Sequence, residues 1–211
     1  MADPRAGTIH PALVLAHARA WIGTPHHPRA ALRGHGADCV GLLRGLAPEL
    51  AGVAVELPPW RADPVVRAQL LSEHLPRHLV PVVLTAPRPG DVVTMRLGRE
   101  RLAHLGVLAE GGRVIHAADY AGRVVCDAWG ADRITSAWAM RAPAGCAQGP
   151  RDLHPADCVA VIRAVTADPL GPARVTIQAP DGTPLARSAP WPSRAAALTA
   201  LPACYTVETV E

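Results

Sequence analysis

A glycine-rich loop runs directly into a helix in the stretch Gly34-His35-Gly36-Ala37-Asp38-Cys39-Val40-Gly41-Leu42. Asp38 is a favourable N-cap, and an apolar stripe follows it at helical spacing, formed by Cys39, Leu43, Leu46 and Leu50. Gly41 and Gly45 lie four residues apart on this helix, and each costs ~1 kcal/mol relative to alanine. Two such glycines therefore predict that another element approaches the helix closely.

Around this stretch, the chain changes from helical to β patterns. Apolar residues at helical spacing predict helices over residues 11–21 and 62–79. After Arg88-Pro89-Gly90-Asp91 the pattern becomes one of short β runs, at 91–97, 103–109, 114–118 and 124–127. Helices followed by an antiparallel meander are typical of the α+β class, which is therefore the predicted fold class.

The last third of the chain reads as a separate small α+β unit. A Pro- and Gly-containing connection over 142–157 leads to predicted strands at 159–165, 174–178 and 205–210, with a helix at 193–201. We therefore expect one domain over residues 1–145 and a C-terminal unit over 150–211. The second unit follows the motifs described below, so we interpret it as a possible docking module.

Composition excludes several classes of function. The chain has 211 residues, of which 49% are hydrophobic and 18% charged, so it can bury a core. Aromatic residues make up only 3%, and the net charge of +3 has no basic run behind it, which argues against a nucleic-acid partner. All 21 basic residues are arginine. Phosphate-loop, Schiff-base and Ser–Lys chemistry all need lysine and are excluded.

The sequence carries no pattern typical of a targeting or membrane segment. Residues 1–8 lack the basic-then-apolar layout of a signal peptide. No apolar run approaches the ~20 residues that a membrane span needs. We therefore expect a protein made in the bacterial cytoplasm and carried elsewhere by other means.

The five cysteines predict neither disulfides nor a cofactor. Their odd number and wide spacing argue against a disulfide framework. Four residues could supply metal ligands, namely Cys126, Cys146, His154 and Cys158, but structural zinc usually shows closely paired ligands. Buried apolar thiols are the favoured interpretation, and neither a metal nor another cofactor is expected.

Cys39 is a candidate nucleophile because it follows an N-cap in the first turn of a predicted helix. The helix dipole and the backbone N–H groups there favour a thiolate. The same groups could stabilise an oxyanion beside the attacked carbon. The alternative is a buried structural cysteine at a helix start.

A thiolate nucleophile needs a base, and two histidines lie on consecutive predicted strands. His104 and His116 are joined through Glu110-Gly111-Gly112. A two-residue turn would place the two rings on opposite faces of the sheet. A three-residue loop pairs residues whose numbers sum to 222 and places both rings on one face, as diagonal neighbours. We predict the three-residue loop; the alternative is that each histidine serves packing alone.

Three separated blocks resemble the NlpC/P60 cysteine peptidases. The first consists of Trp21-Ile22-Gly23-Thr24-Pro25 and the Gly34–Leu42 stretch, the second of Pro89-Gly90-Asp91-Val92-Val93, and the third of His104-Leu105-Gly106-Val107 with Val114-Ile115-His116-Ala117. The order and spacing of these blocks agree with the family pattern, and the resemblance covers roughly residues 10 to 141. Residues 150–211 carry no such resemblance. These motifs are similar to those of the cell-wall peptidases at the tail tips of phages and gene transfer agents.

The resemblance implies a papain-like fold and a catalytic set. Cys39 would be the nucleophile, His104 the general base and acid, and His116 the group that orients His104. His26 stands where many members carry tyrosine, and His26 and Asp38 are candidate substrate contacts. Arg133 lies where relatives often carry arginine and is interpreted as structural or as part of the substrate rim.

The expected function is that of a cysteine endopeptidase. Its substrate would be peptide bonds in peptidoglycan stem peptides, next to D-γ-Glu, and its partners would be tail-hub or baseplate proteins. It would act in the periplasm as part of a phage-like tail tip that opens the cell wall for DNA delivery. Two alternatives stay open: a non-catalytic tail-tip protein on a peptidase fold, and another papain-like thiol amidase or acyltransferase.

Overall fold

A computed structural model describes residues 5–56, 64–85, 87–97, 102–147, 153–165, 168 and 170–210. Four α-helices are present in these ranges: α1 (Pro11–Ala20), α2 (Cys39–Leu50), α3 (Pro64–His78) and α4 (Arg194–Ala200). They agree with the four predicted helices, although residues 62 and 63 lie outside the described part of the chain. The α+β class is confirmed.

A six-stranded antiparallel sheet forms the larger layer, in the order β3-β8-β4-β5-β6-β7. The four predicted β runs are β4 (Val92–Leu97), β5 (Leu102–Ala109), β6 (Arg113–Ala118) and β7 (Arg123–Ala128). Two further strands, β3 (Leu79–Val82) and β8 (Ile134–Met140), were not predicted. Strand β3 contains Pro81 and lies at the edge of the sheet, which is where a strand tolerates proline.

A second sheet belongs to the C-terminal part of the chain, in the order β11-β10-β9-β12. Its strands are β9 (Val159–Ala164), β10 (Ala173–Gln178), β11 (Pro184–Arg187) and β12 (Thr206–Val210). Strand β12 pairs parallel with β9, whereas the other pairings in this sheet are antiparallel. Strand β11 was not predicted, and α4 begins after Ser193, whose hydroxyl accepts a hydrogen bond from the Ala196 N–H at 3.1 Å.

The glycines of α2 allow two close approaches, as predicted. A Cβ added at Gly41 would lie 1.8 Å from the carbonyl oxygen of Ala30. A Cβ at Gly45 would lie 2.1 Å from the buried ring of Trp21. The opposite stripe of α2 is buried in the core through Leu42, Leu46 and Leu50. Helix α2 is thus held between the core and the loop that precedes it.

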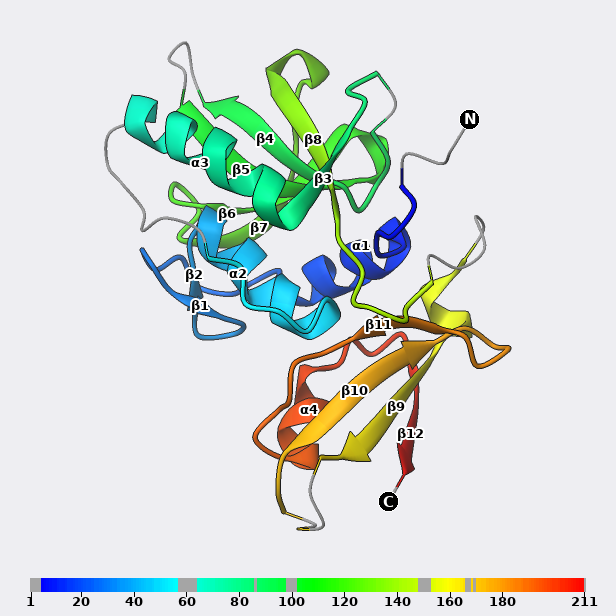
Figure 1. The fold of residues 1–211 in the computed structure, drawn as a ribbon. Helices are drawn as coiled ribbons and strands as arrows, with labels where there is room; N and C mark the ends of the chain where they lie inside the picture. Colours follow the sequence, from blue (N-terminus) through cyan, green and yellow to red (C-terminus); the bar gives the residue numbers. More distant parts are fainter. Residues whose placement is uncertain are drawn as a thin grey trace.

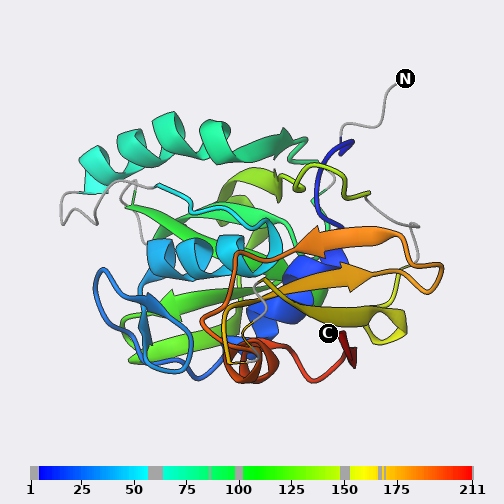
Figure 2. The ribbon, with the colours of Figure 1, turned by 60° about the horizontal axis from the view of Figure 1, so that its bottom comes forward.

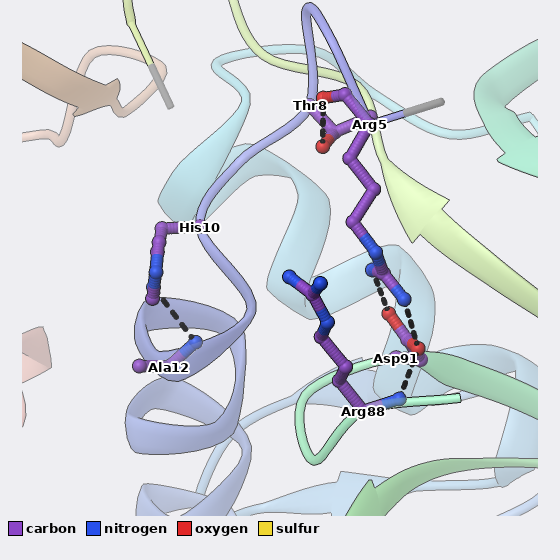
Figure 3. A network of polar contacts seen from close by, with 6 residues as sticks. All are labelled: Arg5, Thr8, His10, Ala12, Arg88 and Asp91. Carbon is purple, nitrogen blue, oxygen red and sulfur yellow. Dashed lines mark hydrogen bonds and ion pairs between the residues drawn. The ribbon is translucent and has the colours of Figure 1, made fainter. Parts of the chain in front are cut away.

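A buried ion pair fixes the N-terminal segment to the start of β4 (Figure 3). Arg5 donates two hydrogen bonds to the two carboxylate oxygens of Asp91, at 2.5 and 2.8 Å. The backbone N–H of Arg88 donates to Asp91 as well, at 2.6 Å. Bidentate contacts of this kind are strong and geometrically specific. They give the Pro-Gly-Asp block a structural role at one end of the sheet.

Helices α1 and α2 lie between the two sheets (Figures 1 and 2). Ala189 donates a backbone hydrogen bond of 2.8 Å to the carbonyl of Pro48 at the end of α2. The buried Tyr205 ring packs 5.7 Å from the ring of His17 on α1, measured between centroids. The division into units 1–145 and 150–211 stays a prediction, and residues 148–152 at the boundary lie outside the described part.

Candidate active site

The first turn of α2 places Cys39 and fixes the loop before it. Cys39 is the first residue of the helix, and Asp38 is its N-cap. One carboxylate oxygen of Asp38 accepts from the Gly41 N–H and the other from the Arg29 N–H, each at 2.6 Å. Both carboxylate oxygens of Asp38 therefore accept hydrogen bonds from backbone N–H groups. The expected contact of Asp38 with substrate stays a prediction. Cys39 itself is buried, at 4% exposure.

The two histidines meet as the three-residue loop predicted. Strands β5 and β6 pair Val107 with Ile115 and Ala109 with Arg113, so paired numbers sum to 222. The loop residues Gly111 and Gly112 both have positive φ, 67° and 68°. Nε2 of His104 and Nδ1 of His116 form a hydrogen bond of 2.9 Å, and the two rings are nearly perpendicular at 87°. Helix α2 contacts both strands, which gives the papain-like arrangement.

Strand β7 adds a carboxylate that sequence reasoning missed. Oδ2 of Asp127 lies 3.7 Å from Nε2 of His116, and the Tyr120 hydroxyl donates a hydrogen bond to the same oxygen. The signal was available in the β6–β7 turn. That turn pairs His116 with Val125, so Asp127, two residues further, shares the face of the sheet with His116. Trp129 was missed too, and its ring lies 5.2 Å from His116 and 6.4 Å from His104.

Burial and the nearby carboxylate act on His116 in opposite directions. Burial lowers the pKa of His116 below its ordinary value, and Asp127 partly offsets this. His116 is therefore neutral at neutral pH, and its single ring proton lies either on Nδ1 or on Nε2. The hydrogen bond to Asp127 raises the pKa of Tyr120 to about 12, so its hydroxyl stays protonated and remains a donor.

Cys39, His104 and His116 share one cavity of about 350 Å³. His26 and Asp38 also line it, together with a short stretch after β6 that contains Asp119 and Tyr120. Nδ1 of His26 lies 3.8 Å from a carboxylate oxygen of the exposed Asp119. All five predicted site residues therefore meet at one place. Arg133 is exposed in a short 3-10 turn, Ala131–Arg133, and does not belong to the described cavity lining.

The remaining cysteines are separate from this site. None of the five cysteines, all of which lie in the described ranges, forms a disulfide, and burial raises the pKa of Cys158 to about 11. Within the described ranges, no group of three or more Cys, His, Asp or Glu side chains could hold a metal ion. None of the helices in those ranges has the length and apolar character that a bilayer crossing requires.

No protein-family model matches the sequence, and no curated protein does. Solved structures of NlpC/P60 domains are similar. The NlpC/p60 domain of the peptidoglycan hydrolase SagA is 20% identical with a TM-score of 0.43, and the match covers 63% of this chain and 100% of that chain. The P60 domain of an antigen from Mycobacterium avium subspecies paratuberculosis is 19% identical with a TM-score of 0.41, and the match covers 62% and 93%.

A third similar structure is a lipoprotein-like protein of the NLP/P60 family from Staphylococcus aureus. It is 17% identical with a TM-score of 0.44, and the match covers 62% of this chain and 41% of that chain. This chain therefore corresponds to less than half of that protein's length.

Proposed function

We propose that the protein is a cysteine peptidase that hydrolyses peptide bonds in peptidoglycan stem peptides, next to D-γ-Glu. The observation that carries the proposal is the hydrogen-bonded His104–His116 pair, which shares a cavity with a cysteine at a helix start. A nucleophile, a base and a group that orients the base are the components of covalent peptide hydrolysis. The motif resemblance over residues 10 to 141 supports the choice of substrate.

The hydrogen bond between the two histidines supports one order of proton transfers in this proposal. His104 uses Nε2 to contact His116, so its Nδ1 is the atom that takes the proton of the Cys39 thiol. The thiolate attacks the scissile carbonyl, and the backbone N–H groups at the start of α2 stabilise the oxyanion. His104 then protonates the leaving amine, and an acyl-enzyme on Cys39 remains. A water molecule, deprotonated by His104, hydrolyses that acyl-enzyme and frees Cys39.

We also propose that the protein works as a component of a phage-like tail tip that opens the cell wall. The similarity of the motifs to those of tail-tip cell-wall peptidases supports this role. The C-terminal sheet, which lies outside the region of resemblance, would then contact a tail-hub or baseplate protein. A pull-down with purified hub protein checks this. Binding by both the wild type and Cys39→Ala supports a docking role, and no binding by the wild type removes this partner from the proposal.

The decisive experiment is mass spectrometry of purified peptidoglycan fragments incubated with the wild type, Cys39→Ala and Cys204→Ala. Wild type and Cys204→Ala, which changes an exposed thiol, should both release new amino termini within the stem peptides. Cys39→Ala should release none above background, because the covalent step is lost. A product with no new amino terminus inside the stem would instead identify another amidase. Cleavage by Cys39→Ala would refute the proposed nucleophile.

A further inference from the structure

The hydrogen bond between the two histidines can be formed in two ways, and only one of them leaves His104 able to act as a base. In the first, Nε2 of His104 donates to Nδ1 of His116, so Nδ1 of His104 carries a lone pair. In the second, Nδ1 of His116 donates, and the single proton of neutral His104 then occupies Nδ1. That form cannot take a proton from Cys39. Which form is present depends on whether the ring proton of His116 lies on Nε2 or on Nδ1.

We propose that Asp127 is a positioning residue that holds His116 in its Nε2–H tautomer and thereby keeps Nδ1 of His104 unprotonated, so that this nitrogen can accept the Cys39 proton. The inference rests on the proposed function, because it assigns His104 as the base. Asp127 lies 3.7 Å from Nε2 of His116, on the side of the ring opposite to the hydrogen bond with His104. A carboxylate there attracts an N–H and repels a ring nitrogen lone pair.

Three surrounding features make this electrostatic preference effective. His116 is only 1% exposed, so its ring is shielded from water, while the Asp127 side chain is 39% exposed at the edge of this contact. The Tyr120 hydroxyl donates to the same carboxylate oxygen and restrains it beside the ring. Trp129 packs edge-on against the His116 ring, with 5.2 Å between centroids and 77° between planes. The ring is thus packed against Trp129 and hydrogen-bonded through Nδ1, while the buried Nε2 makes no hydrogen bond and has the Asp127 carboxylate 3.7 Å away.

The charged and titratable groups around His116 come from several elements. His104 faces it from β5, Asp127 from β7 and Tyr120 from the β6–β7 turn, while Cys39 on α2 shares the cavity. His26 and Asp119 line the same cavity. Among these groups, Asp127 is the one placed 3.7 Å from Nε2 of His116.

The test compares Asp127→Asn, which removes the charge at nearly constant size, with Asp132→Asn. Asp132 is an exposed carboxylate in the Ala131–Arg133 turn and controls for the loss of one surface charge. Three readouts are needed: the nitrogen-15 shifts of both imidazoles, the rate of Cys39 alkylation by iodoacetamide against pH, and kcat and KM on a stem peptide.

Asp127→Asn should shift the His116 proton from Nε2 toward Nδ1 and slow Cys39 alkylation near neutral pH. It should lower kcat about 10- to 100-fold, as loss of an orienting group does, with KM changed less than about twofold because no substrate contact is removed. Asp127→Glu should restore part of kcat, and Asp132→Asn should behave as wild type. A circular dichroism spectrum equal to that of wild type excludes misfolding as the cause.

The outcomes separate this inference from the proposed function. Wild-type cleavage with an unchanged His116 tautomer and unchanged kcat in Asp127→Asn would overturn the role of Asp127 and leave the peptidase standing. A wild-type His116 already protonated on Nδ1 would overturn it too. Expected shifts in tautomer and alkylation, without any stem-peptide cleavage by the wild type, would support the relay and reject the substrate.

Discussion

His116 is a buried imidazole whose ionisation opposes folding. Burial holds its pKa below the ordinary value, so the unfolded chain binds this proton more readily than the folded protein does. Its contribution to stability is therefore complete above the unfolded pKa of about 6.5 and is lost as the pH falls through the folded pKa.

His116→Gln should reduce the pH dependence of stability. Between about pH 7.5 and about pH 5, the wild type should lose more unfolding free energy than the variant, because the variant has no imidazole to protonate. Urea denaturation of both proteins at the two pH values measures the difference. Equal losses would mean that His116 binds protons equally well in the folded and unfolded states.

At the scale of elements, helix propensity and close packing act in opposite directions at the glycines of α2. Helix propensity alone predicts that Gly41→Ala stabilises the helix by ~1 kcal/mol. The structure predicts the opposite sign, because the new Cβ would lie 1.8 Å from the Ala30 carbonyl oxygen. The backbone of the loop must then shift, which displaces the segment that leads to Asp38.

Gly41→Ala should therefore destabilise the protein by about 1–3 kcal/mol, the usual cost of overpacking. The control is Arg44→Ala on the same helix, since Arg44 is exposed and its loss should change stability by less than about 0.5 kcal/mol. Thermal and urea unfolding of the three proteins provide the comparison. A stabilised Gly41→Ala would contradict the close approach.

Elements whose residues carry strong local signals could be predicted from the sequence. The Asp38 cap, the glycines of α2 and the Glu110-Gly111-Gly112 loop fixed the helix start and the histidine register, because each depends on neighbouring residues. Strand β8 was missed because Thr135 and Ser136 interrupt its apolar pattern. Asp127 was missed because its place beside His116 depends on the register that the β6–β7 turn sets, and that register has to be known before the two residues can be assigned to one face.

At the scale of the whole molecule, one hydrophobic core extends from the helices into the C-terminal sheet. Its buried members include Leu46 on α2, Ile162 on β9 and Tyr205 before β12. A core shared by the two sheets couples their unfolding. The sequence indicated a change of pattern near residue 150, but it could not reveal this shared packing, which joins residues distant in the chain.

The full chain should therefore unfold in a single calorimetric transition. Tyr205→Ala should lower the stability of the whole chain by about 3 kcal/mol, because it removes a buried aromatic ring. Leu170→Ala, at a position 83% exposed, should change stability by less than about 0.5 kcal/mol. Two resolved transitions, with only the second shifted by Tyr205→Ala, would show that the units 1–145 and 150–211 unfold independently.

The buried ion pair between Arg5 and Asp91 also affects how the chain folds while it is being synthesised. It joins residues 86 positions apart, and the Ile9 N–H donates to the carbonyl of Met140 still further along. Residues 5–9 leave the ribosome before β4 and β8 do, so they must wait for these strands before they find their partners. Such distant pairings slow folding, so a nascent chain arrested before residue 140 should remain open to protease at its N-terminal segment.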